Sequence, residues 1–306
     1  MSLDATETME PHLNFLEKNY LKDKILVTGS SGFLGSRLVA ALEQTEGVKV
    51  RKFSRREGDN LHNLIHLERA AKDVSGGVIY HLAGKVSFNH RDCEEVMRTV
   101  AVGTQNLLTC AERHNIRKVV IVSSACTCGY SNSPYFQKTE SSFERRGLNC
   151  YVDAKIEQEE LARNSKVPCV IVSPTTCSLP ISGTLVPCGG TNVVDPNDVV
   201  AGIISAMRHG RPKAKYLLSG WDVTYKELYD MVGKPCVVIP RAFKGPLKAA
   251  SRLSDKWYIS PYTVEAAFKY KYFKNNKARE ALGWKPKITL EEMVSKWKNE
   301  KKTSLY

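Results

Sequence analysis

The sequence predicts an α/β fold: a doubly wound parallel sheet followed by a smaller, mainly helical C-terminal lobe. In its first half, short β-rich runs alternate with amphipathic stretches of helical period. The runs are continuously apolar, which is typical of strands covered on both faces. After Pro174 the alternation gives way to a loop rich in Pro, Gly and Thr, and then to helical stretches separated by Pro and Gly.

The elements follow in order. Strands are expected at 24–28, 48–54, 77–83, 118–124 and 167–174. Helices are expected between them at 33–44, 63–73, 93–114 and 151–164. A helix at 198–209, which Asp198 could cap, and a strand at 214–220 would return to the sheet. The remaining helices are expected at 225–232, 243–258, 263–270, 276–284 and 290–299.

This pattern divides the chain into three parts. Residues 1–21 precede the first strand and are expected to form an N-terminal extension, ordered or not. Residues 22–176, with 198–209 and 214–220, would form the nucleotide-binding domain, and 177–197 and 221–306 the substrate lobe.

Composition excludes several classes of protein. The 306 residues are 42% hydrophobic and 25% charged, which is typical of a globular protein, and no apolar run approaches a membrane span. The amino terminus lacks a signal pattern, so we expect a cytoplasmic protein. The net charge of +13 favours phosphate-bearing ligands, and no nucleic-acid motif accompanies it.

Neither cysteine nor histidine spacing predicts a metal site. The nine cysteines are scattered, which favours free thiols in a reducing compartment. Cys126 and Cys128 form a Cys-x-Cys, and His62 and His66 a His-x-x-x-His, but neither has a second ligand pair at zinc spacing.

Three glycines after the first strand predict a dinucleotide site. Gly29, Gly32 and Gly35 lie in TGSSGFLGSRL, between a strand and a helix. Such a turn lets a pyrophosphate approach the backbone and face the amides at the helix amino terminus. The sequence is not a P-loop, because no Gly-Lys-Ser/Thr ends it.

The end of the second strand favours NADP over NAD. An acidic residue there would bind the ribose hydroxyls of NAD. This chain has Ser54 at that position, followed by Arg55 and Arg56, whose guanidinium groups suit a 2′-phosphate.

Three Tyr-x-x-x-Lys pairs stand at a spacing that places both side chains on one helical face. They are Tyr20/Lys24, Tyr151/Lys155 and Tyr270/Lys274. The first runs into the first strand and the third lies in the helical lobe. Only Tyr151/Lys155 follows the strand that ends in Ser124, where a nicotinamide would lie.

Together these motifs resemble the extended short-chain dehydrogenase/reductases, and within them the dihydroflavonol reductase and 3β-hydroxysteroid dehydrogenase-like branch of the epimerase/dehydratase superfamily. The resemblance covers about residues 24–299. Besides the glycine turn and the Tyr-Lys pair, it rests on His81-Leu82-Ala83-Gly84, Ser123-Ser124 and Ser173-Pro174-Thr175-Thr176, and on the phrases at 77–88, 102–125, 216–232 and 275–294.

The resemblance implies a Rossmann fold and three catalytic residues. Tyr151 would be the general acid, Lys155 would bind the nicotinamide ribose and lower the Tyr151 pKa, and Ser124 would hold the substrate oxygen. The implied cofactor-binding residues are Thr28, Gly29, Gly32, Phe33, Leu34, Gly35, Ser54, Arg55, Arg56, Asp59, Ala83, Gly84, Lys155, Pro174, Thr175 and Thr176, with Asp59 at the adenine. Substrate contacts would come from Lys85, Ser87 and Phe88.

The chain departs from the family pattern in several places. Val100 stands where many members have a helper Asn, and SPTTCSLP lacks the usual Arg and Gly. The loop between Pro180 and Asp195 is short, so the pocket would be open or closed by another element. The sheet lacks a full strand between Ser54 and Asp59, which would shorten its adenine edge.

These features favour an NADPH-dependent reductase of a ketone or aldehyde, reversible as an alcohol dehydrogenase. A nucleotide-sugar epimerase or dehydratase, and a non-catalytic NADP sensor or scaffold, remain as alternatives. Its expected partner is a small carbonyl or alcohol substrate, with no nucleic acid and no membrane span, and a homodimer and a monomer both remain open. The sequence does not name the substrate.

Overall fold

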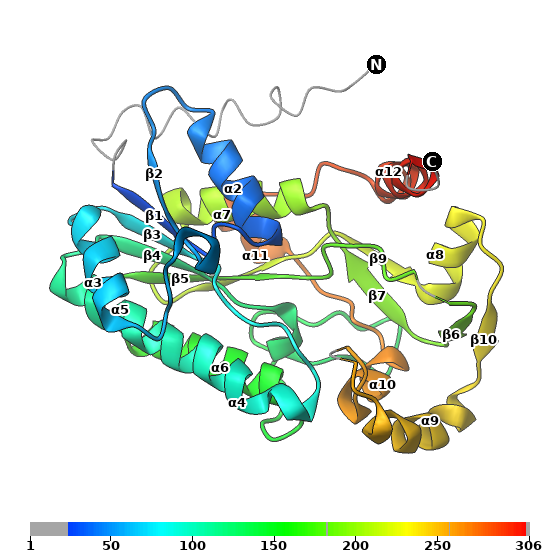
Figure 1. The fold of residues 1–306 in the computed structure, drawn as a ribbon. Coiled ribbons are helices and arrows are strands. Elements are labelled where there is room, and N and C mark those ends of the chain that lie inside the picture. The colour runs from blue at the N-terminus through cyan, green and yellow to red at the C-terminus, as the bar shows by residue number, and fades with distance from the viewer. Residues whose placement is uncertain (1–23, 182, 257, 304–306) are drawn as a thin grey trace.

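The computed structural model describes residues 24–181, 183–256 and 258–303, so the expected extension at 1–21 lies outside the described residues. A six-stranded parallel sheet forms its centre, in the order β2-β1-β3-β4-β5-β8. The strands are β1 (Ile25–Thr28), β2 (Val50–Phe53), β3 (Val78–His81), β4 (Lys118–Val122), β5 (Cys169–Pro174) and β8 (Lys215–Leu218). The predicted fold class is confirmed (Figure 1).

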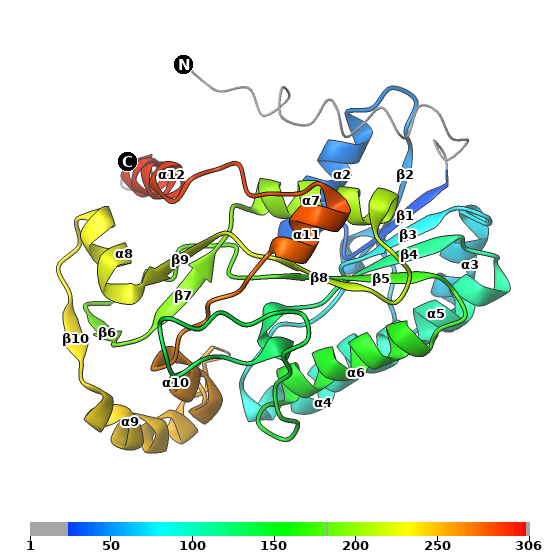
Figure 2. The ribbon, with the colours of Figure 1, turned by 180° about the vertical axis from the view of Figure 1, so that it is seen from behind.

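Alternate residues of each strand serve two hydrophobic cores. Ile25 and Val27 face one core and Leu26 the other, and all three are fully buried. On one side lie α2 (Phe33–Glu43), α7 (Pro196–His209) and α11 (Asn276–Leu282), and on the other α3 (Leu64–Asp73), α5 (Gly103–Arg113) and α6 (Cys150–Asn164) (Figures 1 and 2). The double winding therefore buries both faces of the sheet.

Side-chain caps fix where two of these helices begin. Asn149 caps α6 by accepting a hydrogen bond from the Tyr151 amide at 3.0 Å, and Asp195 caps α7 through the Asn197 amide at 2.8 Å. The expected cap at Asp198 is wrong. Because Asp195-Pro196 starts the helix three residues earlier, Asp198 lies inside it, and its buried carboxylate accepts from the amides of Lys287 and Ile288.

The helix expected at 93–114 is continuous in direction but not in winding. It consists of α4 (Cys93–Met97), a π-helical segment (Arg98–Val102) and α5. Thr104, directly after the wide turn, is fully buried and donates a hydrogen bond to the Val100 carbonyl at 2.6 Å. The change of winding thus brings a hydroxyl toward the sheet.

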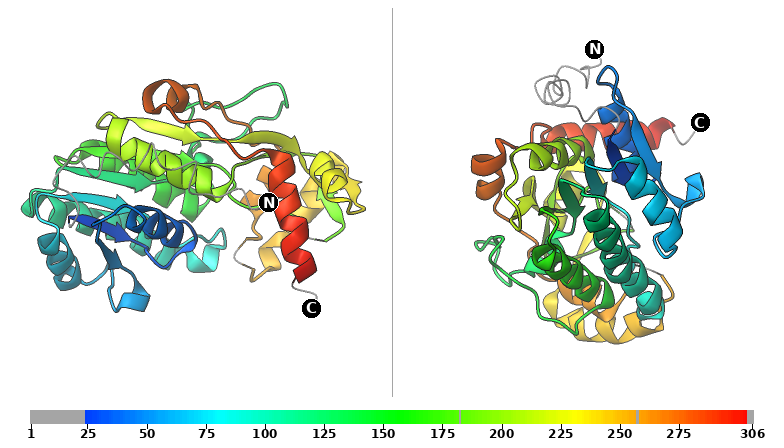
Figure 3. Two further views of the ribbon diagram at one scale, coloured as in Figure 1. Left: turned by 90° about the horizontal axis from the view of Figure 1, so that it is seen from above. Right: turned by 90° about the vertical axis from the view of Figure 1, so that its left-hand side faces the viewer.

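The second half forms the lobe (Figure 1). In it β6 (Leu185–Pro187) pairs with β10 (Val237–Ile239), and β7 (Gly190–Val193) with β9 (Trp221–Thr224), so the loop expected between Pro180 and Asp195 contains two short strands. Its helices are α8 (Tyr225–Val232), α9 (Lys244–Ala250), α10 (Pro261–Ala267) and α12 (Leu290–Thr303). Figure 3 shows α12 beside the lobe, away from α3 and α5.

One helix expected in the lobe packs on the sheet instead. Ala278 and Leu282 of α11 are buried in the core that contains α2 and α7. Trp284, just after α11, is buried there too and donates from Nε1 to the Asp198 carbonyl at 2.7 Å. Its indole therefore packs in the core.

The adenine edge of the sheet is abbreviated. From β2 the chain passes through α3 directly to β3. β1 lies between these two strands, paired with β2 on one side and with β3 on the other. Among the described residues no strand lies outside β2, so β2 is the edge strand.

The expectation that all nine cysteines are free thiols is wrong for two of them. Cys93, at the start of α4, and Cys150, at the start of α6, form a disulfide with their Cα atoms 5.3 Å apart. The pair is 57 residues apart in the chain, so only the packing of α4 on α6 brings it together. No helix in the described ranges is long and apolar enough to cross a membrane.

Candidate active site at the carboxyl edge of the sheet

The glycine turn after β1 is shaped by close contacts that exclude side chains. Gly29 has φ +70°, and a Cβ there would lie 2.7 Å from the Ala83 nitrogen. At Gly35 a Cβ would meet the Gly29 oxygen at 2.0 Å, and at Gly32 the same oxygen at 3.1 Å. The result is a bare backbone in front of the amino terminus of α2, which fits the pyrophosphate of a dinucleotide.

Predicted cofactor residues from other strands lie at the same edge. Ala83 and Gly84 follow β3, and a Cβ on Gly84 would stand 3.9 Å from the Lys155 ammonium. Pro174 ends β5, and the hydroxyls of Thr175 and Thr176 bond to Asn192 at 2.6 Å and Thr191 at 3.2 Å. Phe33 and Leu34 open α2, where Phe33 is 53% exposed.

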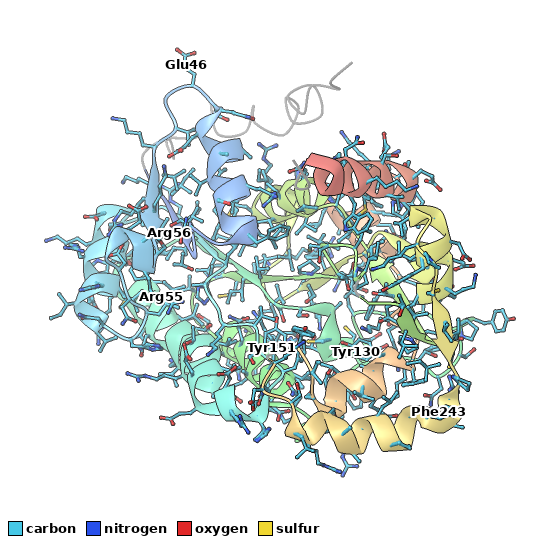
Figure 4. The ribbon with its side chains drawn as sticks, turned by 45° about the vertical axis from the view of Figure 1, so that its right-hand side comes forward. Glu46, Arg55, Arg56, Tyr130, Tyr151 and Phe243 are labelled. Carbon is cyan, nitrogen blue, oxygen red and sulfur yellow. A yellow bond between two sulfur atoms is a disulfide. The ribbon has the colours of Figure 1, made fainter. Side chains whose placement is uncertain are left out.

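The end of β2 combines a buried hydroxyl with two exposed cations. Ser54 is buried, and its hydroxyl has no hydrogen-bond partner among the described residues. Arg55 and Arg56 follow in the 3₁₀ turn η1 (Arg55–Glu57) and are exposed (Figure 4). This edge can pair an anionic group with the two guanidinium groups.

Asp59, the expected adenine contact, is already paired. Its carboxylate is 1% exposed and forms ion pairs with Arg51 at 2.9 Å and Arg69 at 3.3 Å. The carboxylate therefore anchors the loop after β2 to β2 and α3.

Ser124 and Tyr151 meet at the end of β4. The Ser124 hydroxyl lies near enough to the Tyr151 phenol to influence its pKa, and it accepts from the Cys126 amide at 3.3 Å as it caps the turn η4 (Ala125–Cys128). Tyr151 is 6% exposed. Burial raises the pKa of Tyr151 far above its ordinary value, whereas the nearby Ser124 side chain lowers it.

Lys155 lies one helical turn beyond Tyr151 but bonds elsewhere. Its ammonium donates to the Val122 carbonyl at 2.8 Å and to the Gln158 side-chain oxygen at 2.8 Å. Burial lowers its pKa to about 8, against the opposing effects of Cys126 and Glu159. The expected lowering of the Tyr151 pKa by Lys155 is thus not found in this structure, where burial dominates.

A buried polar chain continues from Lys155 to the glycine turn. The Gln158 amide nitrogen lies 2.8 Å from the Thr104 hydroxyl, which is 2.9 Å from Nε2 of His81, whose Nδ1 is 2.7 Å from the Thr28 hydroxyl. Thr28, His81, Thr104 and Gln158 are all fully buried. The network joins β1, β3, α5 and α6 directly beneath the site.

A cluster of aromatic side chains packs beside the Tyr151 ring. Phe88 packs edge-on against Tyr151 with ring centroids 5.0 Å apart, and it stacks on Tyr262 of α10 at 6.2 Å. Tyr130 lies 6.3 Å from Tyr262. Figure 4 shows Tyr130 and Tyr151 between the sheet and the lobe. Through Tyr262, α10 is therefore an element of the lobe that packs against the aromatic residues beside Tyr151.

Of the three predicted substrate contacts, the structure brings only Phe88 to Tyr151. Lys85 pairs with Asp92 at 3.1 Å and with Glu95, and the Ser87 hydroxyl donates to Asp92 at 2.6 Å. These two side chains tie the loop after β3 to the start of α4. The described residues contain no cluster of three or more potential metal ligands.

Sequence reasoning missed Gln158, Tyr130 and Tyr262. The signal for Gln158 is its place three residues after Lys155, on the same helical face. Tyr130 follows Gly129 after β4, at the edge where ligands gather in parallel sheets. No local signal marks Tyr262, which reaches the site only because α10 folds back over it.

Comparisons with known proteins agree with this geometry. Residues 25–184 match the NAD dependent epimerase/dehydratase family. Sterol demethylase protein B of Methylococcus capsulatus is 29% identical over 262 residues, covering 72% of this chain and 79% of that protein. The bifunctional dihydroflavonol 4-reductase/flavanone 4-reductase of Pyrus communis is 24% identical over 308 residues, covering 82% and 87%.

Solved structures share the fold. A short-chain dehydrogenase/reductase superfamily protein from Agrobacterium tumefaciens with bound NAD has a TM-score of 0.70 at 20% identity, covering 92% of this chain and 98% of that one. RMD from Pseudomonas aeruginosa, complexed with NADPH, has a TM-score of 0.67 at 16% identity, covering 90% and 99%. The same fold thus holds either cofactor.

Proposed function

Because the chain belongs to the NAD dependent epimerase/dehydratase family, an enzyme family that binds pyridine nucleotides, we propose that it is an NADPH-dependent reductase of a ketone or aldehyde, reversible as an alcohol dehydrogenase. One observation carries the proposal. Tyr151 lies near Ser124, which influences its pKa, and one helical turn from Lys155, at the edge of the sheet that holds the glycine turn.

Each residue has a role that its chemistry supports. Ser124 donates a hydrogen bond to the carbonyl oxygen, and Tyr151 donates the proton that this oxygen gains. Bound NADPH supplies the hydride. Lys155 uses two of its three N–H groups within the protein, which leaves one for the nicotinamide ribose. Its positive charge also favours the tyrosinate left after proton transfer.

The raised Tyr151 pKa suits this residue to act as the general acid in reduction. Burial keeps the phenol protonated at neutral pH, so it is ready to donate a proton to a carbonyl oxygen. Oxidation of an alcohol needs the opposite form, and at neutral pH that form requires the nearby positive charges of Lys155 and an oxidised nicotinamide.

The pocket wall and the β2 edge support the finer assignments. Phe88, Tyr130 and Tyr262 suit a carbonyl compound with apolar substituents. Ser54, in place of an acid, with Arg55 and Arg56 beside it, suits the 2′-phosphate of NADP.

Two alternatives predict other outcomes. A nucleotide-sugar epimerase or dehydratase would use the same Tyr and Lys, but with tightly bound NAD and an acidic residue at the end of β2, where this chain has Ser54. A sensor or scaffold would bind NADP without turnover, and the retained Ser124, Tyr151 and Lys155 argue against it.

The test is a panel of ketones and aldehydes with apolar substituents, assayed with NADPH and with NADH. The parent should oxidise NADPH, and Tyr151→Phe should lose about 10²- to 10⁴-fold in kcat, the usual contribution of a positioned general acid. Tyr270→Phe is the matched control, because Tyr270 is also followed by a Lys at i+4 but lies in the lobe. NADPH binding without turnover of any compound would favour the sensor.

A further inference from the structure

The buried amide of Gln158 lies between the Lys155 ammonium and the Thr104 hydroxyl, at 2.8 Å from each. Gln158 is fully buried, with 0% of its surface exposed to solvent, so its amide must find its partners within the protein. An ammonium has only donors, so the amide oxygen must face Lys155 and the amide nitrogen must face Thr104. The orientation of the amide is therefore fixed by its partners.

The same assignment of donors and acceptors determines the direction of the remaining hydrogen bonds in the network. Thr104 donates its one hydroxyl proton to the Val100 carbonyl at 2.6 Å, so it can only accept from Gln158 and His81. Nε2 of His81 must then carry the proton, and Nδ1 must accept from the Thr28 hydroxyl. Thr28 in turn accepts from the Ala83 amide at 3.3 Å. Every member has one possible role.

With these donors and acceptors, the network supports the side chains structurally and does not conduct protons. Thr104 would have to release its bond to Val100 before a proton could pass between His81 and Gln158. Burial, helped by the charge of Lys155, lowers the pKa of His81 to about 3, so the imidazole stays neutral. The network is thus rigid, and one end of it holds Lys155.

We propose that Gln158 is the positioning residue of Lys155: its amide, oriented by Thr104 and His81, holds the ammonium charged and aimed at the nicotinamide ribose. This inference rests on the proposed function for its kinetic consequence only, because the bond itself precedes any substrate. The second acceptor, the Val122 carbonyl, belongs to the backbone, so Gln158 is the acceptor that a substitution can remove.

Other groups that act on Lys155 are few. From β3 it faces His81, from η4 Cys126, and from its own helix Glu159, whose carboxylate is paired with Lys215 of β8. Cys126 is buried, which raises its thiol pKa to about 12 and keeps it neutral. Glu159 is therefore the nearby anion, and its ion pair with Lys215 offsets its effect. The neutral Gln158 oxygen is the side-chain acceptor that Lys155 bonds directly.

The test compares Gln158→Leu and Gln158→Glu with the control Gln105→Leu, an exposed glutamine on α5 next to Thr104. Without cofactor or substrate, the Lys155 side chain is titrated by NMR with ¹³C-labelled lysine, assigned by Lys155→Arg. Loss of the acceptor should lower the Lys155 pKa by about one pH unit, the size of one hydrogen bond to a charged group. The carboxylate of Gln158→Glu should raise it, and Gln105→Leu should leave it unchanged.

In turnover, kcat of Gln158→Leu at pH 7.5 should fall by about threefold and recover toward the parent at pH 6, because fewer Lys155 side chains are charged at the higher pH. KM for the carbonyl compound should change little. Opposite shifts in the two variants cannot come from a loosened helix, and if Gln158→Leu does not fold, the upward shift in Gln158→Glu decides. An unchanged Lys155 pKa in a folded variant overturns the proposal. A parent that turns over no carbonyl compound overturns the proposed function, while the titration still decides the role of Gln158.

Discussion

Glu159 and Lys215 form an ion pair at 2.9 Å, with both side chains 5% exposed, beneath the end of β4. The Glu159 carboxylate also accepts from the Ser123 and Thr127 hydroxyls at 2.7 and 2.9 Å and from Arg163 at 2.9 Å. Ser123 directly precedes Ser124. The ion pair therefore fixes the strand end from which the substrate-oxygen residue projects.

Removing one partner of this ion pair should destabilise the fold strongly. Lys215→Met leaves a buried carboxylate with only Arg163 and two hydroxyls, and we expect the free energy of unfolding to fall by about 3 kcal/mol. Lys166→Met is the control, since its pair with Glu112 is 82% and 48% exposed and should contribute less than about 1 kcal/mol. Urea unfolding measures both. Equal losses in the two variants would contradict the prediction.

The same carboxylate should make stability depend on pH. Burial alone would raise the pKa of Glu159, but Lys215 and the two hydroxyls outweigh it and hold the pKa below the ordinary 4.5. A lowered pKa stabilises the fold at pH values above the ordinary one, and this contribution is lost as the pH falls through 4.5 toward the folded value. Glu159→Gln should therefore lose less stability than the parent between pH 6 and pH 4. Parallel curves for the two proteins would refute this.

The disulfide gives a third prediction. Cys93 and Cys150 close a loop of 57 residues, for which the chain-entropy relation gives about 4 kcal/mol of stabilisation. Because the bond joins the starts of α4 and α6, reduction should lower Tm and loosen the turn that begins at Tyr151. Differential scanning fluorimetry with and without dithiothreitol measures the shift. Cys150→Ser should lower Tm without dithiothreitol and Cys236→Ser should not, since Cys236 is a free thiol in the lobe. A Tm that does not respond to reductant would count against the bond.

The sheet and the glycine turn could be predicted because their signals are local. Continuous apolar runs such as 118–124 have the length and period of buried strands, and Gly29, Gly32 and Gly35 lie within seven residues of one another. The closeness of Ser124 and Tyr151 to the glycine turn then follows from the rule that parallel strands end at one edge.

The rest depends on packing between distant segments. Tyr262 and Phe88 are far apart in the chain and meet because α10 folds over the loop after β3. Cys93 reaches Cys150 only through the contact of α4 with α6. The π-helical segment before Thr104 carries no local sequence signature that marks the change of winding. Asp195 and Asp198 have the same side chain and could each cap a helix. Only Pro196, which favours the first helical position, identifies Asp195 as the cap.

The cofactor preference gives the last prediction. Arg55→Ala should weaken NADPH binding by about 10- to 100-fold, the loss of one charge-assisted contact to a phosphate, and should leave NADH binding unchanged, because NADH has no 2′-phosphate. Ser54→Asp should weaken NADPH further and strengthen NADH, since a carboxylate at the end of β2 repels the phosphate and accepts from the ribose hydroxyls. Arg117→Ala is the control, an exposed arginine at the opposite end of the sheet, just before β4. Fluorescence titration gives both dissociation constants. If Arg55→Ala weakens the binding of NADPH and NADH equally, the guanidinium does not bind the 2′-phosphate. That result would also refute the predicted preference for NADPH.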